Sequence, residues 1–175
     1  MSFKNTELPN RRTTPINGEV PQDKAMIIRH YEDKDLDSVI EVWLNASKIA
    51  HPFLKKDFLE GEITNMRTLY LPHAETWVAE ADGAVVGFLS LVGNEVGGLF
   101  VDPDFHGQRF GKTLMDKAVS LRGALELDVF KQNPIGRRFY KRYGFLEDHE
   151  YDHEPTGERV IRLVYRPRRA GTQTG

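Results

Sequence analysis

Apolar residues recur along the chain at two spacings, and these predict strands and helices in a mixed order. The short run at residues 26–31 (MIIRHY) is followed by apolar positions at helical spacing over 33–49. A strand followed by a helix is therefore expected at the start of the fold. Residues 54–71 repeat the helical spacing, and the second helix is predicted to stop before Pro72.

The next part of the chain has the pattern of strands. Residues 75–93 hold two β-rich runs separated by an Asp-Gly pair, which predicts a hairpin. A further strand is expected over 94–102. Residues 124–130 (ALELDVF) alternate strictly between apolar and polar positions, and residues 158–165 (ERVIRLVY) fit a closing strand.

Two more helices are predicted between these strands. The first follows residues 106–113 and has its apolar residues at helical spacing. The second covers residues 133–143, because Asn133 fits a helix cap and Pro134 the first helical position. Gly144 is expected to end it.

The resulting order, roughly βααβββαβαβ, predicts one mixed α+β domain over residues 26–167. Residues 1–25 are polar, contain prolines and lack periodicity, so we expect a flexible tail. Residues 168–175 have the character of a second tail. We interpret the acidic run 147–154 (EDHEYDHE) as a solvated loop that could also attract a cationic acceptor.

Composition narrows the function classes. The 175 residues suit one domain, and a net charge of −2 gives no basic excess for nucleic acid. The absence of cysteine excludes disulfides, cysteine nucleophiles and zinc–thiolate sites. No membrane span, signal peptide or metal-ligand spacing is recognisable. We therefore expect a cytoplasmic protein that binds neither metal, membrane nor nucleic acid.

The stretch 106–113 (HGQRFGKT) at first looks like a Walker A loop. That loop needs four residues between its glycines, whereas Gly107 and Gly111 are separated by three. It also follows the fourth predicted strand rather than the first, so a P-loop NTPase is disfavoured. A glycine-bearing turn before a helix still exposes backbone N–H groups, which together with the helix dipole bind pyrophosphate.

The segment LFVDPDFHGQRFGKTLM resembles the acetyl-CoA-binding motif of the GNAT superfamily of N-acetyltransferases, V-x-P-x-x-[RQ]-x-x-G-x-[GA]. Val101, Pro103 and Gly111 match that motif. His106 stands where Arg or Gln is usual, and Arg109 where the first glycine is usual. Arg109 is therefore expected to need a backbone conformation compatible with a side chain, and its own side chain could reach a phosphate.

A second segment, NPIGRRFYKRYGF, resembles the family signature N-x-x-A-x-x-F-Y-x-x-x-G-F, with Gly136 in place of alanine. The matching residues are Asn133, Phe139, Tyr140, Gly144 and Phe145. The stretches HPFL and LPHAETWV are similar to those of short bacterial single-domain members.

The resemblance implies a GNAT fold, a central, mostly antiparallel mixed sheet whose fourth and fifth strands splay apart, flanked by helices. It implies that acetyl-CoA is the cosubstrate and that its pantetheine arm pairs with Leu99, Phe100 and Val101. Gly97-Gly98 would permit the bulge that separates the strands. The remaining cofactor-binding residues implied by the two motifs are His106, Gly107, Gln108, Arg109, Phe110, Gly111, Lys112, Asn133, Gly136 and Phe139.

Catalytic roles also follow from the resemblance. Tyr140 matches the general acid that protonates the departing thiolate, although a packed helix tyrosine is the alternative. Glu95 is the candidate general base, with His51 or ordered water as open alternatives. Glu126 and Asp128 are further candidates, and a solvated face is the other interpretation of both.

The family mechanism implies an N-acetyltransferase in which a primary amine directly attacks the acetyl thioester. The acceptor is an amine-bearing small molecule or a protein or peptide, which the sequence does not identify, and the protein is expected to be a monomer or homodimer. The alternative is an impaired acyl-CoA-binding module that acts as a sensor or partner.

Overall fold

The computed structural model describes residues 25–167, and its strands form one sheet in the order β1-β2-β3-β4-β5-β7-β6. The strands are β1 Met26–His30, β2 Glu75–Ala81, β3 Ala84–Val92, β4 Glu95–Val101, β5 Leu125–Phe130, β6 Leu146–His153 and β7 Glu158–Tyr165. All neighbouring pairs are antiparallel except β4 and β5. The predicted mixed, mostly antiparallel sheet is confirmed. The expected tails, 1–25 and 168–175, lie outside the described residues apart from Ala25.

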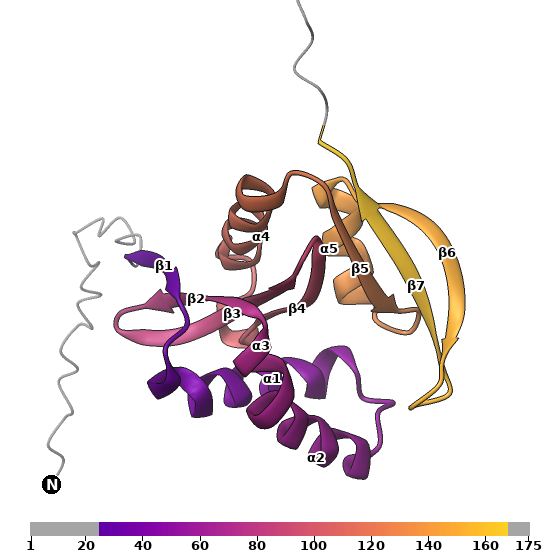
Figure 1. Cartoon of the computed structure of the whole chain (residues 1–175), viewed down its shortest axis with the longest axis horizontal. Helices are drawn as coiled ribbons and strands as arrows, with labels where there is room; N and C mark the ends of the chain where they lie inside the picture. The colour runs from indigo at the N-terminus through magenta and orange to yellow at the C-terminus, as the bar shows by residue number, and fades with distance from the viewer. Residues whose placement is uncertain (1–24, 168–175) are drawn as a thin grey trace, which may run out of the picture.

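Helices cover both faces of the sheet, with α4 above the strands in Figure 1 and α1 and α2 below. The helices are α1 Leu36–Ala50, α2 Lys56–Asn65, α3 Leu71–His73, α4 Phe110–Arg122 and α5 Pro134–Tyr143, with short 3-10 turns η1 Asp33–Asp35 and η3 Pro103–Phe105. A π-helical turn, η2 Met66–Tyr70, joins α2 to α3. The predicted second helix is therefore one nearly continuous segment that passes Pro72 and ends at His73.

Two apolar clusters bury these helices against the sheet. On one face, Leu114 and Met115 of α4 are fully buried with Leu125 and Leu127 of β5. On the other face, α1 packs through a second cluster of buried residues that includes Trp43. The periodicity predicts α1 and α4 correctly because each has a single buried face.

The acidic run 147–154 lies mainly in β6, so its interpretation as a loop was wrong. β6 pairs antiparallel with β7 along its length and forms the edge of the sheet. Nearly all of its residues are exposed or half-buried, so the run has no apolar alternation to reveal a strand. Charged residues are common on such edges, where they discourage pairing with another chain.

A bulge in β4 opens the sheet at its centre. Ser90 of β3 pairs with Gly98, but the next residue, Leu91, pairs with Val96, so Gly97 is the extra residue of the bulge. The parallel pairing of β4 with β5 is limited to Glu95 and Glu126 in the described chain. The two strands therefore part beyond this point, as the resemblance implied.

Candidate active site

A cavity of about 550 Å³ follows the parted edges of β4 and β5. It is lined by five consecutive residues of β4, 96–100, and by residues 128–130 of β5. Consecutive strand residues point to opposite faces, so a cavity that touches all of them must run along the strand edge. The other walls come from β3, α1, α2, η2, α3, α5 and β6, together with the loops beside them. The cavity thus passes through the sheet at the gap left by the bulge.

The N-terminus of α4 has unpaired backbone N–H groups. The first backbone bond at this end runs from Thr113 N–H to the carbonyl of Arg109, at 2.9 Å. In the part of the chain that the structure describes, no bond is made by the N–H groups of Phe110, Gly111 and Lys112. Such a helix end can bind an anion through its backbone and dipole.

The turn before α4 uses left-handed backbone at two positions, Gly107 with φ 78° and Arg109 with φ 70°. The expectation that Arg109 needs a conformation suited to a side chain was wrong, because this region favours glycine. The loop therefore keeps the glycine-like geometry although arginine occupies the position. The Arg109 side chain has no hydrogen bond or ion pair within residues 25–167, so its contact with a phosphate stays a prediction.

Other polar side chains of the loop bond to the protein itself. His106 Nε2 lies 3.0 Å from the carbonyl oxygen of Val101, which fixes that nitrogen as a donor. Gln108 donates to the carbonyl of Asp104 at 3.2 Å, and Lys112 Nζ pairs with Asp116 at 2.6 Å. These contacts brace the turn, so the loop presents backbone groups more than side chains.

The two sequence motifs meet at Gly111. A Cβ at this position would lie 3.4 Å from Phe139 of α5 and 3.7 Å from Val101 of β4. The start of α4 therefore packs closely against both α5 and the end of β4. Phe110, in contrast, buries its ring in the core and offers only its backbone.

Asn133 closes the N-terminus of α5. Its Oδ1 accepts the N–H of Gly136 at 2.9 Å, and its Nδ2 lies 3.1 Å from Nε2 of His51. Because Nδ2 can only donate, His51 must accept through Nε2 and carry its proton on Nδ1. Burial lowers the pKa of His51 to about 4. A neutral His51 with an occupied lone pair is poorly placed to act as a base, and that role stays a hypothesis.

Gly136 leaves room for this arrangement. A Cβ there would lie 2.7 Å from Asn133 Nδ2 and 3.3 Å from a methyl group of Val129. Asn133 itself is buried, at 7% exposure. The cap and its contact with His51 therefore depend on the absence of a side chain at residue 136.

Tyr140 lines the cavity with a buried side chain, at 9% exposure. Its ring packs against Phe139 and Phe145, with centroids 5.3 and 5.5 Å away. Its hydroxyl has no hydrogen-bond partner in the described chain. Burial raises the pKa of Tyr140, which keeps the phenol protonated. Among residues 25–167 the fully buried polar side-chain atoms without a partner are Ser47 Oγ and Arg137 Nε, so the unpartnered Tyr140 hydroxyl is accessible and can bond a substrate in the cavity.

Glu95 lies away from this point. Both of its carboxylate oxygens pair with Arg162, at 3.1 and 3.4 Å, and the residue is not part of the cavity lining. The structure thus does not bring Glu95 together with Tyr140, and its role as base stays a prediction. Asp128 of β5, in contrast, lines the cavity.

Sequence reasoning missed the aromatic residues of the cavity wall. Phe130, at the end of β5, has its ring 5.2 Å from that of His51 and 5.5 Å from that of His153. Phe58 of α2 also contacts His153, at 6.2 Å. Each comes from a different element, and no local pattern links them.

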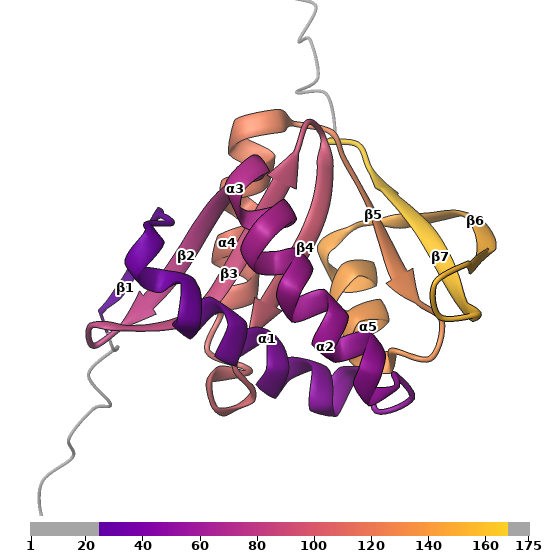
Figure 2. The same ribbon diagram turned by 60° about the horizontal axis from the view of Figure 1, so that its bottom comes forward.

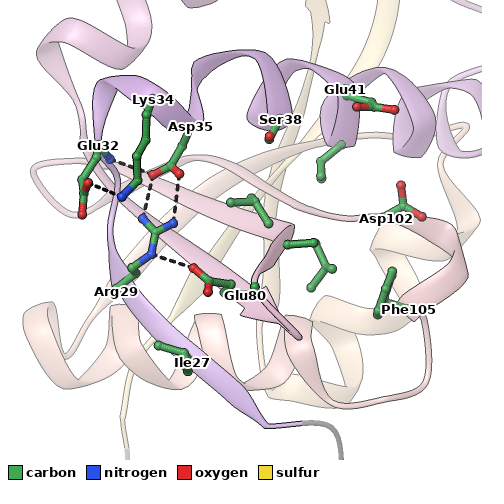
Figure 3. Close-up of a pocket in the computed structure, with 15 residues that line it drawn as sticks. Ile27, Arg29, Glu32, Lys34, Asp35, Ser38, Glu41, Glu80, Asp102 and Phe105 are labelled. Atoms are coloured by element: carbon green, nitrogen blue, oxygen red, sulfur yellow. Dashed lines mark hydrogen bonds and ion pairs between the residues drawn. The ribbon is translucent and has the colours of Figure 1, made fainter.

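A second cavity, of about 890 Å³, lies over β1, the start of α1 and the β2–β3 hairpin (Figure 3). At one end of it Arg29 pairs with Asp35 at 2.7 Å and with Glu80 at 2.8 Å. Lys34 pairs with Glu32 beside them. These charged side chains form ion pairs with one another. None of the residues predicted for the active site lines this cavity. The smaller cavity is therefore the candidate active site.

The residues that the structure describes hold no group of three His, Cys, Asp or Glu side chains placed to bind a metal ion. None of their helices combines the length and hydropathy needed to span a bilayer.

Comparison with known proteins finds a family model whose matched range includes both sequence motifs. Residues 72–147 match the model of the acetyltransferase (GNAT) domain. The chain is 32% identical over 120 residues to peptidyl-lysine N-acetyltransferase YiaC of Escherichia coli, covering 68% of this chain and 82% of that protein. It is 34% identical over 119 residues to peptidyl-lysine N-acetyltransferase YjaB of Salmonella typhimurium, covering 67% and 81%.

Solved structures agree with the fold. The solution structure of apo YjaB from Escherichia coli gives a TM-score of 0.73 at 28% identity, covering 81% of this chain and 97% of that one. The PaiA N-acetyltransferase of Thermoplasma acidophilum, solved in complex with coenzyme A, gives 0.61 at 23% identity, covering 81% and 99%.

Proposed function

The chain belongs to the GNAT superfamily of N-acetyltransferases, and we propose that it transfers the acetyl group of acetyl-CoA to a primary amine. The observation that carries this proposal is the cavity at the gap between β4 and β5, which holds the unpaired hydroxyl of Tyr140. We expect one substrate to enter this cavity from each face of the sheet. Direct transfer between two bound substrates needs such an arrangement.

Acetyl-CoA fits the residues at one side of this gap. The unpaired N–H groups of Phe110, Gly111 and Lys112 would bind its pyrophosphate, with the α4 dipole in support. Leu99 and Phe100, on the free edge of β4, line the cavity and would pair with the pantetheine arm. The carbonyl of Val101 already accepts from His106, so Val101 would contribute less than the resemblance implied. The Thermoplasma neighbour, which has the same fold, was solved in complex with coenzyme A, and this supports the proposed use of acetyl-CoA.

Tyr140 would supply the proton for the leaving group. The acceptor ammonium first loses a proton to water or to a basic side chain. As the neutral nitrogen then bonds to the acetyl carbon, the carbon–sulfur bond breaks, the nitrogen gives a second proton to water or to the same base, and the thiolate takes the phenolic proton. Burial raises the pKa of Tyr140, and it also destabilises a thiolate in the same cavity, so the proton transfer stays feasible. The tyrosinate regains its proton from solvent after the products leave.

A lysine side chain of a peptide is the acceptor we favour. Two relatives bear the name peptidyl-lysine N-acetyltransferase. The cavity also reaches past three exposed apolar residues, Leu69, Tyr70 and Val92, toward the surface. This rim could hold peptide residues on either side of the lysine, a use that a free small amine would not need.

Binding and turnover test the proposal separately. Acetyl-CoA or CoA at about 100 times its dissociation constant should add about 2.7 kcal/mol to the stability, whereas ATP should add much less. A mass-spectrometric screen of peptides, polyamines and amino acids with acetyl-CoA should then show a 42 Da gain, roughly one acetyl group, on a lysine peptide. Stabilisation by CoA without acetylation of any amine would favour the sensor alternative. A larger shift with ATP would contradict the assignment of the loop.

A further inference from the structure

A network of charged side chains lies on one face of β4, β5 and β7, beside the part of the sheet that α1 and α2 cover. Figure 2 shows α1 and α2 in front of β2–β4, with β5, β7 and β6 to their right. On these strands Arg162 of β7 pairs with three carboxylates: Glu95 at 3.1 Å, Glu126 at 2.9 Å and Asp128 at 3.3 Å. The network adjoins the active-site cavity, because Asp128 belongs to both.

The three carboxylates are not equivalent. Both oxygens of Glu95 contact Arg162, and those of Glu126 contact Arg162 and Arg166. Asp128 uses only Oδ2, which accepts the hydroxyl of Tyr151 at 2.6 Å and faces Arg162. Its Oδ1 has no partner among residues 25–167. Asp128 is therefore a fixed carboxylate with one free oxygen, and it alone of the three lines the cavity.

The surroundings of Asp128 suit an aliphatic cation. Aromatic side chains from several elements line the same cavity: His51, Phe58, Phe100, Phe130 and His153. Aromatic faces pack well against methylene groups and attract a cation, and a carboxylate bonds an ammonium directly. The side chain of Tyr140, only 9% exposed, lines this cavity, and its hydroxyl has no partner among residues 25–167, which independently indicates that a ligand binds here.

We propose that Asp128 binds the ammonium group of the acceptor through its Oδ1 and selects lysine-type amines over uncharged ones. Tyr151 and Arg162 are positioning residues that hold Oδ2 and so orient the carboxylate. The pKa of Tyr151 is raised to about 12, mainly by burial and secondly by the hydrogen bond to Asp128. Its hydroxyl therefore stays protonated and remains a donor. This assignment rests on the proposed function and concerns the acceptor side of the same cavity.

The matched test compares Asp128→Asn with Glu126→Gln. Both substitutions remove one carboxylate from the same face of β5 and from the same arginine, but only Asp128 lines the cavity. The ligands are a lysine peptide and the same peptide with norleucine, which lacks the ammonium. Their dissociation constants are measured by calorimetry on the CoA-saturated protein, so the readout does not depend on turnover.

The wild type should bind the lysine peptide about 10- to 100-fold more tightly than the norleucine peptide, the range of a charged hydrogen bond. Asp128→Asn should abolish this preference, and Glu126→Gln should change it by less than about threefold. Tyr151→Phe should reduce the preference partly, because the carboxylate remains but loses its orientation. If Asp128→Asn does not fold, Asp128→Glu serves in its place, since a longer carboxylate displaces the charge.

A lysine preference that survives in Asp128→Asn would overturn the assignment. The proposed function would still stand in that case if the wild type acetylates the lysine peptide. A wild type that binds CoA but shows no preference for the lysine peptide would also overturn it. A wild type that binds neither acetyl-CoA nor CoA would contradict the proposed function itself.

Discussion

The N-termini of α4 and α5 flank the gap between β4 and β5. They differ in whether a side chain caps their first backbone N–H groups. At α4 the cap residue, Arg109, is left-handed and provides no side-chain bond, so the first N–H groups stay open. At α5 the cap residue, Asn133, accepts the N–H of Gly136 through its side chain. The open end is available to an anion, whereas the closed end fixes side chains around the cavity.

The two helices therefore contribute to the candidate site in different ways, one through backbone groups and the other through side chains. The α4 end would bind an anion through backbone groups, so we expect the departures from the family motif at His106 and Arg109 to cost little affinity. Helix α5 contributes side chains instead: Asn133 at its N-terminus has specific partners, and Tyr140 further along the helix lines the cavity. Substitutions at the α5 end should therefore cost more than those at the α4 end.

The largest effect is expected for Tyr140→Phe. Loss of the phenolic proton should lower kcat by roughly 10²- to 10⁴-fold, the usual contribution of a general acid. The ring remains, so the dissociation constant of acetyl-CoA and the melting temperature should change little. Steady-state kinetics with a lysine peptide, together with calorimetry, measure both. A kcat within about threefold of wild type would instead make Tyr140 a wall residue.

The next effect concerns the pH dependence contributed by His51. Its folded-state pKa is about 4, below the unfolded value of about 6.5. Between these values the unfolded chain binds more protons, so stability should fall as the pH drops from about 6.5 to 4. Its contribution is roughly 1 kcal/mol per pH unit within that window. In urea titrations over this pH range, the free energy of unfolding of His51→Gln should fall less steeply with decreasing pH than that of the wild type. An unchanged dependence on pH would contradict the buried, neutral state of His51.

Asn133→Ala should have a smaller effect on stability. Loss of the cap should lower the free energy of unfolding by about 1–2 kcal/mol, since the Gly136 N–H loses its partner. Asn133→Ser is the control: serine can cap the helix but is too short to reach His51. Measured by chemical denaturation, Asn133→Ser should recover a substantial part of the unfolding free energy that Asn133→Ala loses. Equal losses in both variants would show that the His51 contact, rather than the cap, carries the stability.

These contrasts also explain which features the sequence could predict. Asn133 as a cap and Gly97 at the bulge follow from local residue types, and the buried helix faces follow from periodicity. β6 escaped prediction because an exposed edge strand has no apolar alternation. The bond between His51 and Asn133 joins residues 82 positions apart, and the different states of Glu95 and Asp128 depend on the distant Arg162. Such pairings are set by the tertiary fold, and one sequence does not encode them locally.

The smallest expected effect is at the open helix end. Arg109 adopts φ 70°, which costs a non-glycine residue about 1 kcal/mol, and its side chain has no partner in the described chain. Arg109→Gly should therefore leave stability unchanged or raise it by up to about 1 kcal/mol, since the greater freedom of glycine in the unfolded chain offsets part of the gain.

Arg109→Ala is the matched control, because it removes the side chain but keeps the strained conformation. Acetyl-CoA titrations of both variants then separate the two roles of Arg109. If the backbone does most of the binding, affinity should fall little in either variant. An equal loss of about 1–3 kcal/mol in both would mean that the guanidinium reaches a phosphate. A loss of stability in Arg109→Gly would contradict the left-handed turn, and with it the basis for an open N-terminus at α4.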